Sequence, residues 1–98
     1  MDGAFLHGYM AYTVYILQSE RDGSFYVGHS ASLRERLRRH NEERSPYTKA
    51  KIPWRVVYQE EYLTRSQAIK REQELKGKKS RAYMEQLVRA SRSVSREG

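Results

Sequence analysis

Two short β-prone stretches separated by an Asp-Gly turn constrain the fold of this chain more than any other feature. Residues 12–17 and 24–29 are rich in tyrosine, valine and other residues that favour strands. Between them, Asp22-Gly23 supplies a positive φ at little cost, as a tight connection between antiparallel strands requires. The sequence therefore predicts an antiparallel hairpin.

Successive side chains of a strand point to opposite faces of the sheet. We expect one face of the hairpin to carry Val14, Ile16, Phe25 and Val27. Tyr15 and Tyr26 are then expected on the other face. Tyrosine is common in strands, so the simpler interpretation is packing. A phenol held near cationic groups, however, has a lowered pKa and can accept a proton from water, which makes both tyrosines candidate catalytic residues.

Capping signals predict three helices. Ser32 caps a helix that begins at residue 33 and runs to about residue 43, because Glu35 completes a capping box. Thr64 and Gln67 form a second capping box, which begins a helix that Gly77 ends. Ser80 caps the third helix.

A third strand is predicted over residues 54–63, which are rich in Trp, Val and Tyr. The order strand, strand, helix, strand, helix, helix predicts an α+β fold, with a three-stranded antiparallel sheet flanked by helices. A chain of 98 residues supports one such domain, expected over residues 11–90. Residues 1–10 are expected to form a flexible leader, and residues 91–98 a disordered basic tail.

The charge of the chain favours polyanionic partners. Nineteen Lys and Arg against twelve Asp and Glu give a net charge of +7, which points first to nucleic acid and second to an anionic membrane surface. The absence of cysteine excludes a disulfide or a thiolate metal site. No run approaches the roughly 20 apolar residues that span a bilayer, and residues 1–10 do not resemble a signal peptide. We expect a cytoplasmic protein without a membrane partner.

Glu72 does not fit a purely structural role on the second predicted helix. The buried arc expected of that helix consists of Ala68, Ile69 and Leu75. Glu72 falls between these positions, where a carboxylate is costly unless a cation or hydrogen bonds compensate it. The alternative is that Glu72 pairs with Arg71 or Lys76 at the surface.

Arg36 and His40 lie one turn apart on the flank of the apolar stripe of the first helix. A guanidinium and an imidazole side by side suit a site that grips a phosphate and moves a proton. The alternative for His40 is a cation that balances the dipole at the end of the helix. Arg34 and Arg38 point away from the core and are available to a nucleic-acid backbone or to solvent.

Taken in order, these positions resemble the GIY-YIG nuclease superfamily, most closely its small single-domain bacterial members, which are similar to the nuclease module of the bacterial excinuclease. Thr13-Val14-Tyr15 stands where the first tripeptide is expected, with Thr13 in place of glycine, and Tyr26-Val27-Gly28 matches the second. The stretch from Arg36 to Asn41 matches Arg-x-x-x-His-Asn. Glu72 stands where the family places its metal-binding glutamate. The ordered set extends over about residues 12–88.

The resemblance implies a metal-dependent DNA endonuclease, with RNA as the alternative substrate. In that interpretation Glu72 binds Mg²⁺ or Mn²⁺, Arg36 offsets charge on the phosphate, and Tyr15 or Tyr26, with His40 nearby, takes a proton from water. We lean slightly to Tyr15. The residues expected to bind nucleic acid are Arg34, Arg38, Tyr47, Lys49 and Lys51.

Larger family members use an asparagine late in the domain, but Asn41 is the only asparagine of this chain. Its supporting role then falls to His40, Asn41 or Tyr47. The resemblance also implies structure-preferring or weakly selective cleavage, in DNA repair or recombination. The main rival is a nucleic-acid-binding module that keeps the fold without catalysis. A third interpretation is an interaction protein in which the tyrosines and Glu72 are only packed.

Overall fold

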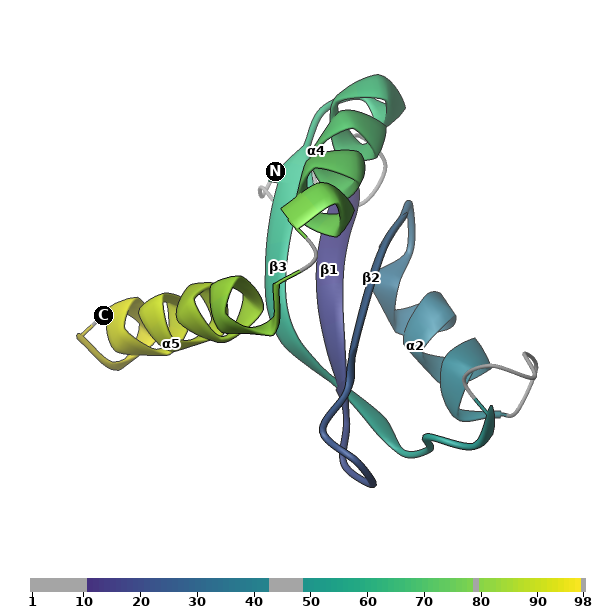
Figure 1. Cartoon of the computed structure of the whole chain (residues 1–98). Coiled ribbons are helices and arrows are strands. Elements are labelled where there is room, and N and C mark those ends of the chain that lie inside the picture. The colour runs from purple at the N-terminus through teal and green to yellow at the C-terminus, as the bar shows by residue number, and fades with distance from the viewer. Residues whose placement is uncertain (1–10, 43–48, 79, 98) are drawn as a thin grey trace.

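Three antiparallel strands form the sheet at the centre of the protein (Figure 1). The computed structural model describes residues 11–42, 49–78 and 80–97. Strand β1 (Tyr12–Ser19) lies between β2 (Phe25–Ser30) and β3 (Trp54–Tyr62). The predicted hairpin is the pair β1–β2, and the predicted third strand pairs with the other edge of β1.

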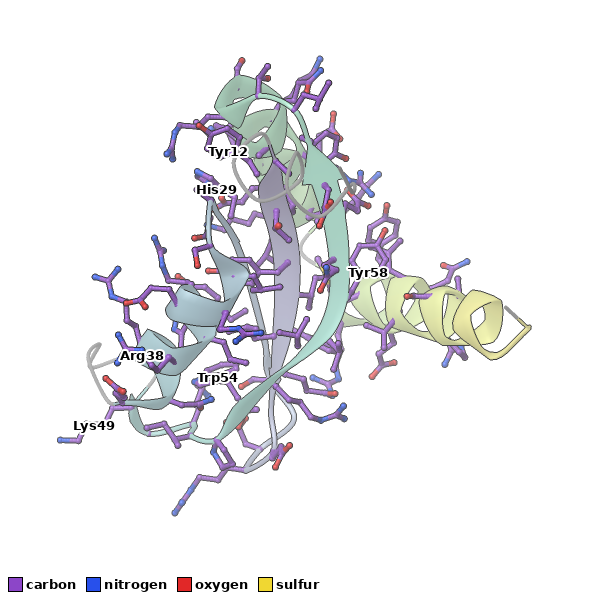
Figure 2. The ribbon with its side chains drawn as sticks, turned by 180° about the vertical axis from the view of Figure 1, so that it is seen from behind. Tyr12, His29, Arg38, Lys49, Trp54 and Tyr58 are labelled. Atoms are coloured by element: carbon purple, nitrogen blue, oxygen red, sulfur yellow. The ribbon has the colours of Figure 1, made fainter. Side chains whose placement is uncertain are left out.

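Helices cover both faces of this sheet. Helix α2 (Leu33–Asn41) packs on one face, and α4 (Arg65–Lys78) packs on the other. Helix α5 (Arg81–Glu97) begins against the α4 face and extends away from the sheet beyond β3 (Figure 1). Seen from behind, α2 lies in front of the strands and α4 lies behind them (Figure 2). The predicted α+β fold and its order of elements are confirmed.

Each face of the sheet has its own hydrophobic cluster. The buried members of the α4-face cluster are Val14, Ile16, Val27, Ala68, Leu75 and Met84. Those of the α2-face cluster are Tyr15, Leu17 and Trp54. Phe25 packs with the first cluster and Tyr26 with the second, so the predicted alternation along the hairpin is confirmed.

A bulge in β3 places two consecutive side chains on the same face. Ile16 pairs with Tyr58, whereas the next residue of β1, Leu17, pairs with Val56, so Val57 is the extra residue. Val57 and Tyr58 both pack on the α4-face cluster, while Val56 packs on the other. The bulge thereby sets which face the later residues of β3 reach.

The predicted capping residues begin all three helices. The Ser32 hydroxyl accepts from the Glu35 N–H at 3.4 Å. The Thr64 hydroxyl accepts from the Gln67 N–H at 3.1 Å, and the Gln67 side chain accepts from the Thr64 N–H at 3.3 Å. The Ser80 hydroxyl accepts from the N–H three residues later at 3.1 Å. Each bond satisfies an amide that the first turn of a helix leaves without an intrahelical partner.

Two predicted ends differ from the structure. Gly77 lies within the last turn of α4, which ends at Lys78, and it does not adopt the positive φ found at Gly23. Helix α5 continues to Glu97, although we predicted a disordered tail from residue 91. Residues 89–97 contain neither Gly nor Pro, and arginine and alanine are good helix formers, so the helix propagates. The predicted leader lies outside the described residues, and within them no helix is long and apolar enough to cross a membrane.

Candidate active site

Tyr15 lies in the middle of β1, on the face that α2 covers, and is fully buried. Its partner across the sheet is Gly28 of β2. A Cβ atom at residue 28 would lie 2.7 Å from the Oη atom of Tyr15 and 2.9 Å from its Cζ atom. Glycine is therefore needed at residue 28 because it alone leaves room for the phenol against β2.

The hydroxyl of Tyr15 has no hydrogen-bond partner among the described residues. Burial, together with neighbouring Tyr26, raises the pKa of Tyr15 to about 12, and the guanidinium of Arg36 opposes this shift only in part. Arg36 comes close enough to act on the phenol but does not reach hydrogen-bond geometry. The lowered pKa that we expected from nearby cations is therefore wrong for Tyr15, because the loss of hydration outweighs their attraction.

Tyr26 and His40 pack beside Tyr15 on the same face. Tyr26 comes from β2, and His40 comes from the last turn of α2. Their ring centroids are 4.6 Å apart in an edge-to-face arrangement, and Trp54 closes the cluster 6.0 Å from the Tyr26 ring. Tyr26 is only half-buried, in contrast to Tyr15. Of the two phenols, it is the one that solvent reaches.

His40 is buried, with 7% of its surface exposed. Burial lowers the pKa of His40, and the positive charges of Arg36 and Arg39 lower it further. The imidazole is therefore neutral at pH 7, which rules out the alternative of a cation that balances the helix dipole. Its Nε2 atom has no hydrogen-bond partner within the described ranges, so this ring nitrogen is available for chemistry.

Arg36 completes the group that the structure brings together on the α2 face. It acts electrostatically on both Tyr15 and His40, and its side chain is half-buried. Unlike Arg38, it forms no ion pair with any residue that the structure describes. A guanidinium with no carboxylate partner in the described part of the chain, beside a phenol and an imidazole, can bind an external anion.

The residues predicted to bind nucleic acid differ in how far they are already engaged. Arg34 and Lys49 are exposed. Arg38 forms ion pairs of 2.7 Å and 2.6 Å with the glutamates three residues before it and four residues after it. Lys51 pairs at 2.6 Å with an aspartate of the hairpin turn. Arg38 and Lys49 lie near each other at the C-terminal end of α2 (Figure 2). Tyr47 lies outside the described residues.

Glu72 reaches the sheet from the face opposite to both phenols. Its Oε1 atom lies 2.5 Å from Nδ1 of His29 on β2, and its Oε2 atom lies 2.5 Å from Nζ of Lys76. Glu72 therefore does not share a face of the sheet with the other four candidate catalytic side chains. Because β2 is an edge strand, Glu72 and Tyr15 lie on either side of it, and the charge of Glu72 still acts on the phenol.

The position of Glu72 follows from the rotation of α4. Ala68 and Leu75 are fully buried, whereas Ile69, which we expected to be buried, is 36% exposed. Arg71 and Glu72 consequently flank the buried stripe on its two sides. Arg71 turns towards β3 and Glu72 towards β2. The ion pair between Glu72 and Lys76, which we predicted as one alternative, is present. The other predicted ion pair, between Glu72 and Arg71, is not formed between these two described residues.

Lys76 and His29 stabilise the negative charge of the Glu72 carboxylate. Burial raises the pKa of this carboxyl, but the contacts with Lys76 and His29 outweigh that effect and leave the pKa below its usual value. Glu72 is therefore ionised at neutral pH. Its side chain is 16% exposed, so the carboxylate is partly open to solvent.

Comparison with known proteins places this arrangement in a family. Residues 11–85 match the GIY-YIG catalytic domain. The chain belongs to the GIY-YIG nuclease family. It is 44% identical to a UPF0213 protein of Staphylococcus aureus strain Mu3 over 64 residues, which cover 64% of this chain and 77% of that protein. The UPF0213 protein SA0446 of strain N315 matches to the same extent. The solution NMR structure of UPF0213 protein BH0048 from Bacillus halodurans is 33% identical, with a TM-score of 0.52, over 83% of this chain and 85% of that one.

GIY-YIG nucleases depend in general on a divalent metal, and Glu72 fits that requirement as a single hard oxygen donor. Its carboxylate is ionised, partly exposed and already balanced by the ammonium group of Lys76. No group of three or more His, Asp or Glu side chains surrounds a possible ion within the described residues. Water would supply the remaining ligands, as Mg²⁺ prefers.

Two residues of this GIY-YIG domain gain a role that the sequence did not assign. Asn41 donates to the Trp54 carbonyl at 3.1 Å and accepts from the Trp54 N–H at 2.7 Å, so it fixes the end of α2 to the start of β3. His29 holds Glu72. Its position two residues after Val27, on the face that α4 covers, was the signal that could have identified it.

Proposed function

We propose that this protein is a metal-dependent endonuclease that hydrolyses phosphodiester bonds in DNA. The observation that carries the proposal is the meeting of Tyr15, Tyr26, Arg36 and His40, from three different elements, in a chain that matches the GIY-YIG catalytic domain. Packing alone does not account for this cluster, because it buries a phenol hydroxyl and an imidazole nitrogen that have no partner among the described residues.

Arg36 binds the phosphate in this proposal. Its guanidinium acts on Tyr15 and His40 and has no carboxylate partner in the described part of the chain. Water attacks the phosphorus atom while the bond from phosphorus to the leaving sugar oxygen breaks. Arg36 offsets the negative charge that grows on the phosphoryl oxygens during this step.

Tyr26 accepts a proton from the attacking water as its hydroxyl gives its own proton to Nε2 of His40, and the leaving sugar oxygen takes a proton from solvent. We prefer Tyr26 to Tyr15 because Tyr26 is half-exposed, whereas Tyr15 is fully buried and has a pKa of about 12. His40 can accept the phenolic proton because its imidazole is neutral and its Nε2 atom has no partner among the described residues. Tyr15 remains protonated and is buried too deeply to contact the phosphate, so it acts on the site through the neighbouring Arg36.

Glu72 is the residue that would hold Mg²⁺ or Mn²⁺. When bound, such an ion supplies positive charge for the scissile phosphate and the leaving oxygen. Glu72 approaches from across β2, so this assignment requires the substrate to lie at the edge of that strand. The contact of Glu72 with His29, which follows the Gly28 that packs against Tyr15, supports this placement.

DNA binding is assigned to exposed cations around α2. Arg34 and Lys49 are exposed, and Arg38 can exchange its surface ion pairs for phosphate contacts. Such contacts read little sequence and weaken with salt. We therefore propose that the protein prefers particular DNA structures to particular sequences. We also propose that it acts in DNA repair or recombination and that it is located in the cytoplasm.

The test is cleavage of fluorescent single-stranded, duplex and branched oligonucleotides by the full chain, with and without Mg²⁺. We expect metal-dependent cleavage that Glu72→Gln abolishes. Glu74→Gln is the matched control, because Glu74 is an exposed glutamate two residues away on the same helix. It should cut at the wild-type rate.

Cleavage by Glu72→Gln at the wild-type rate would show that the mechanism is wrong. A salt-sensitive mobility shift without cleavage of any substrate would support the binding module instead of the enzyme. The absence of both cleavage and salt-dependent binding would leave only a packing role for the cluster.

A further inference from the structure

The carboxylate of Glu72 is held between two protein groups of different kinds. One oxygen contacts the imidazole of His29, and the other contacts the ammonium group of Lys76, each at 2.5 Å. His29 lies at the end of β2 beside α4 (Figure 2). Both carboxylate oxygens are therefore engaged before any metal arrives.

His29 is a fixed partner. It belongs to a strand, its side chain is 21% exposed, and its second ring nitrogen faces the guanidinium of Arg65 at 3.5 Å. Because Arg65 can only donate, this contact favours the tautomer in which Nδ1–H of His29 donates to Glu72. The guanidinium is itself held over the ring of Tyr12, 4.9 Å from the ring centroid.

Lys76 is the more exposed partner. Its side chain is 55% exposed, against 16% for Glu72. The pair lies one helical turn apart, and exposed pairs of this type contribute little to stability, because two flexible side chains must be ordered. The oxygen that contacts Lys76 is consequently the one that another cation can take.

We propose that His29 is a positioning residue for Glu72 and that Lys76 is a built-in counter-ion, which a divalent metal displaces. This inference rests on the proposed role of Glu72 as metal ligand. In the metal-free protein the ammonium group neutralises the carboxylate. If a metal took the place of the ammonium group, the hydrogen bond from His29 would still hold the other carboxylate oxygen. Ligating carboxylates in proteins are in general oriented by such hydrogen bonds.

His29 also connects the two sides of β2. It follows Gly28, the residue against which the phenol of Tyr15 packs. A carboxylate fixed to His29 is therefore fixed relative to that phenol, although the two groups come from opposite faces of the sheet. This connection gives Glu72 a defined position at the strand edge where the substrate is proposed to lie.

The two partners should have opposite effects on metal binding. His29→Ala removes an orienting hydrogen bond and should weaken Mn²⁺ binding by about 10- to 100-fold. Lys76→Met removes a competing cation and should strengthen Mn²⁺ binding by roughly two- to fivefold. A merely structural role for both residues predicts no strengthening by either variant.

The experiment is a titration of the full chain with Mn²⁺ in the absence of DNA, with free ion measured by electron paramagnetic resonance. His29→Asn, which keeps a side-chain N–H donor, should restore much of the affinity that His29→Ala loses. Lys70→Met is the control for the loss of one lysine from an exposed position of α4, and it should bind Mn²⁺ as the wild type does. In cleavage assays, the Mg²⁺ concentration for half-maximal rate should move in the same direction as the Mn²⁺ affinity.

Glu72→Gln separates the failure of this inference from the failure of the proposed metal ligand. If it abolishes Mn²⁺ binding while His29→Ala and Lys76→Met bind as the wild type, the inference is overturned and the metal ligand stands. If Glu72→Gln binds Mn²⁺ like the wild type, the proposed metal ligand is wrong and the inference fails with it. Loss of folding in His29→Ala would leave the decision to His29→Asn and Lys76→Met, because a Lys76→Met protein without tighter binding also overturns it.

Discussion

Both faces of the sheet carry tyrosines, but the hydroxyl groups of these tyrosines have different surroundings on the two faces. On the α4 face, the carboxylate of Glu60 accepts hydrogen bonds from the hydroxyls of Tyr58 and Tyr62. The same carboxylate is gripped by two nitrogens of Arg71, at 2.9 Å and 3.1 Å. On the α2 face, the hydroxyl of Tyr15 has no partner among the described residues.

This difference separates a structural network from a candidate site. Glu60 and its partners join β3 to α4 with charge-assisted bonds, and such satisfied networks add rigidity. A buried polar atom without a partner costs free energy, so a fold that keeps two of them, on Tyr15 and His40, needs a reason other than stability. We infer that the Glu60 network on the α4 face maintains the fold and that the cluster of Tyr15 and His40 on the α2 face is kept for chemistry.

The largest expected effect is on the rate of DNA cleavage, and it differs between variants of two arginines of α2. Arg36→Ala should lower the rate of DNA cleavage by about 10²- to 10³-fold, because it removes the charge that balances the phosphoryl oxygens. Arg39→Ala, an exposed neighbour on the same helix, should cleave at close to the wild-type rate. Steady-state rates at fixed salt measure both. Equal losses in the two variants would mean that only overall positive charge matters.

The next effect tests the contact between β2 and Tyr15. Gly28→Ala should lower the free energy of unfolding by about 1–3 kcal/mol, because its Cβ would overlap the phenol. Gly77→Ala is the matched control, since nothing lies within 4 Å of the added carbon. It should raise the free energy of unfolding by about 0.5–1 kcal/mol, as alanine favours the helix. Urea unfolding measures both, and a harmless Gly28→Ala would contradict the close approach.

A smaller effect compares one hydroxyl on each face. Tyr58→Phe removes a donor to Glu60 and should lower the free energy of unfolding by about 1 kcal/mol. Tyr15→Phe removes a hydroxyl with no partner in the described structure, so stability should stay within about 0.5 kcal/mol or rise. Cleavage should show the reverse order, with Tyr15→Phe the slower enzyme. Equal losses of stability would remove the distinction between the faces.

The smallest effect is a dependence of stability on pH that originates at His40. The pKa of His40 in the folded protein lies below its ordinary value of 6.5, because of burial and the charges of Arg36 and Arg39. The unfolded chain therefore binds a proton more readily, and the stability present above pH 6.5 is lost as the pH falls through the lower, folded pKa. Urea unfolding at about pH 7.5 and about pH 5.5 should show a smaller loss for His40→Gln than for the wild type. If His40→Gln and the wild type lose the same stability between these two pH values, the pH dependence originates at another group.

Local rules in the sequence determined the elements and the content of each face. The Asp-Gly turn and the alternation of residues 12–17 and 24–29 predicted the hairpin, and they placed Tyr15 and Tyr26 together on one face. Ser32, Thr64 and Ser80 predicted the helix starts. These features depend on neighbours a few residues apart, so the sequence alone carries them. The cytoplasmic location stays a prediction.

Only the tertiary structure decided how deep each group is buried and which face each helix covers. Burial reversed the expected shift in the pKa of Tyr15, because desolvation depends on everything packed around a phenol and not on the nearest cation. The rotation of α4 against the sheet placed Glu72 across β2, in contact with His29, 43 residues away along the chain. Helical periodicity fixes spacing along a helix, but contacts with the sheet fix its rotation, and a modest rotation decides which strand a side chain reaches.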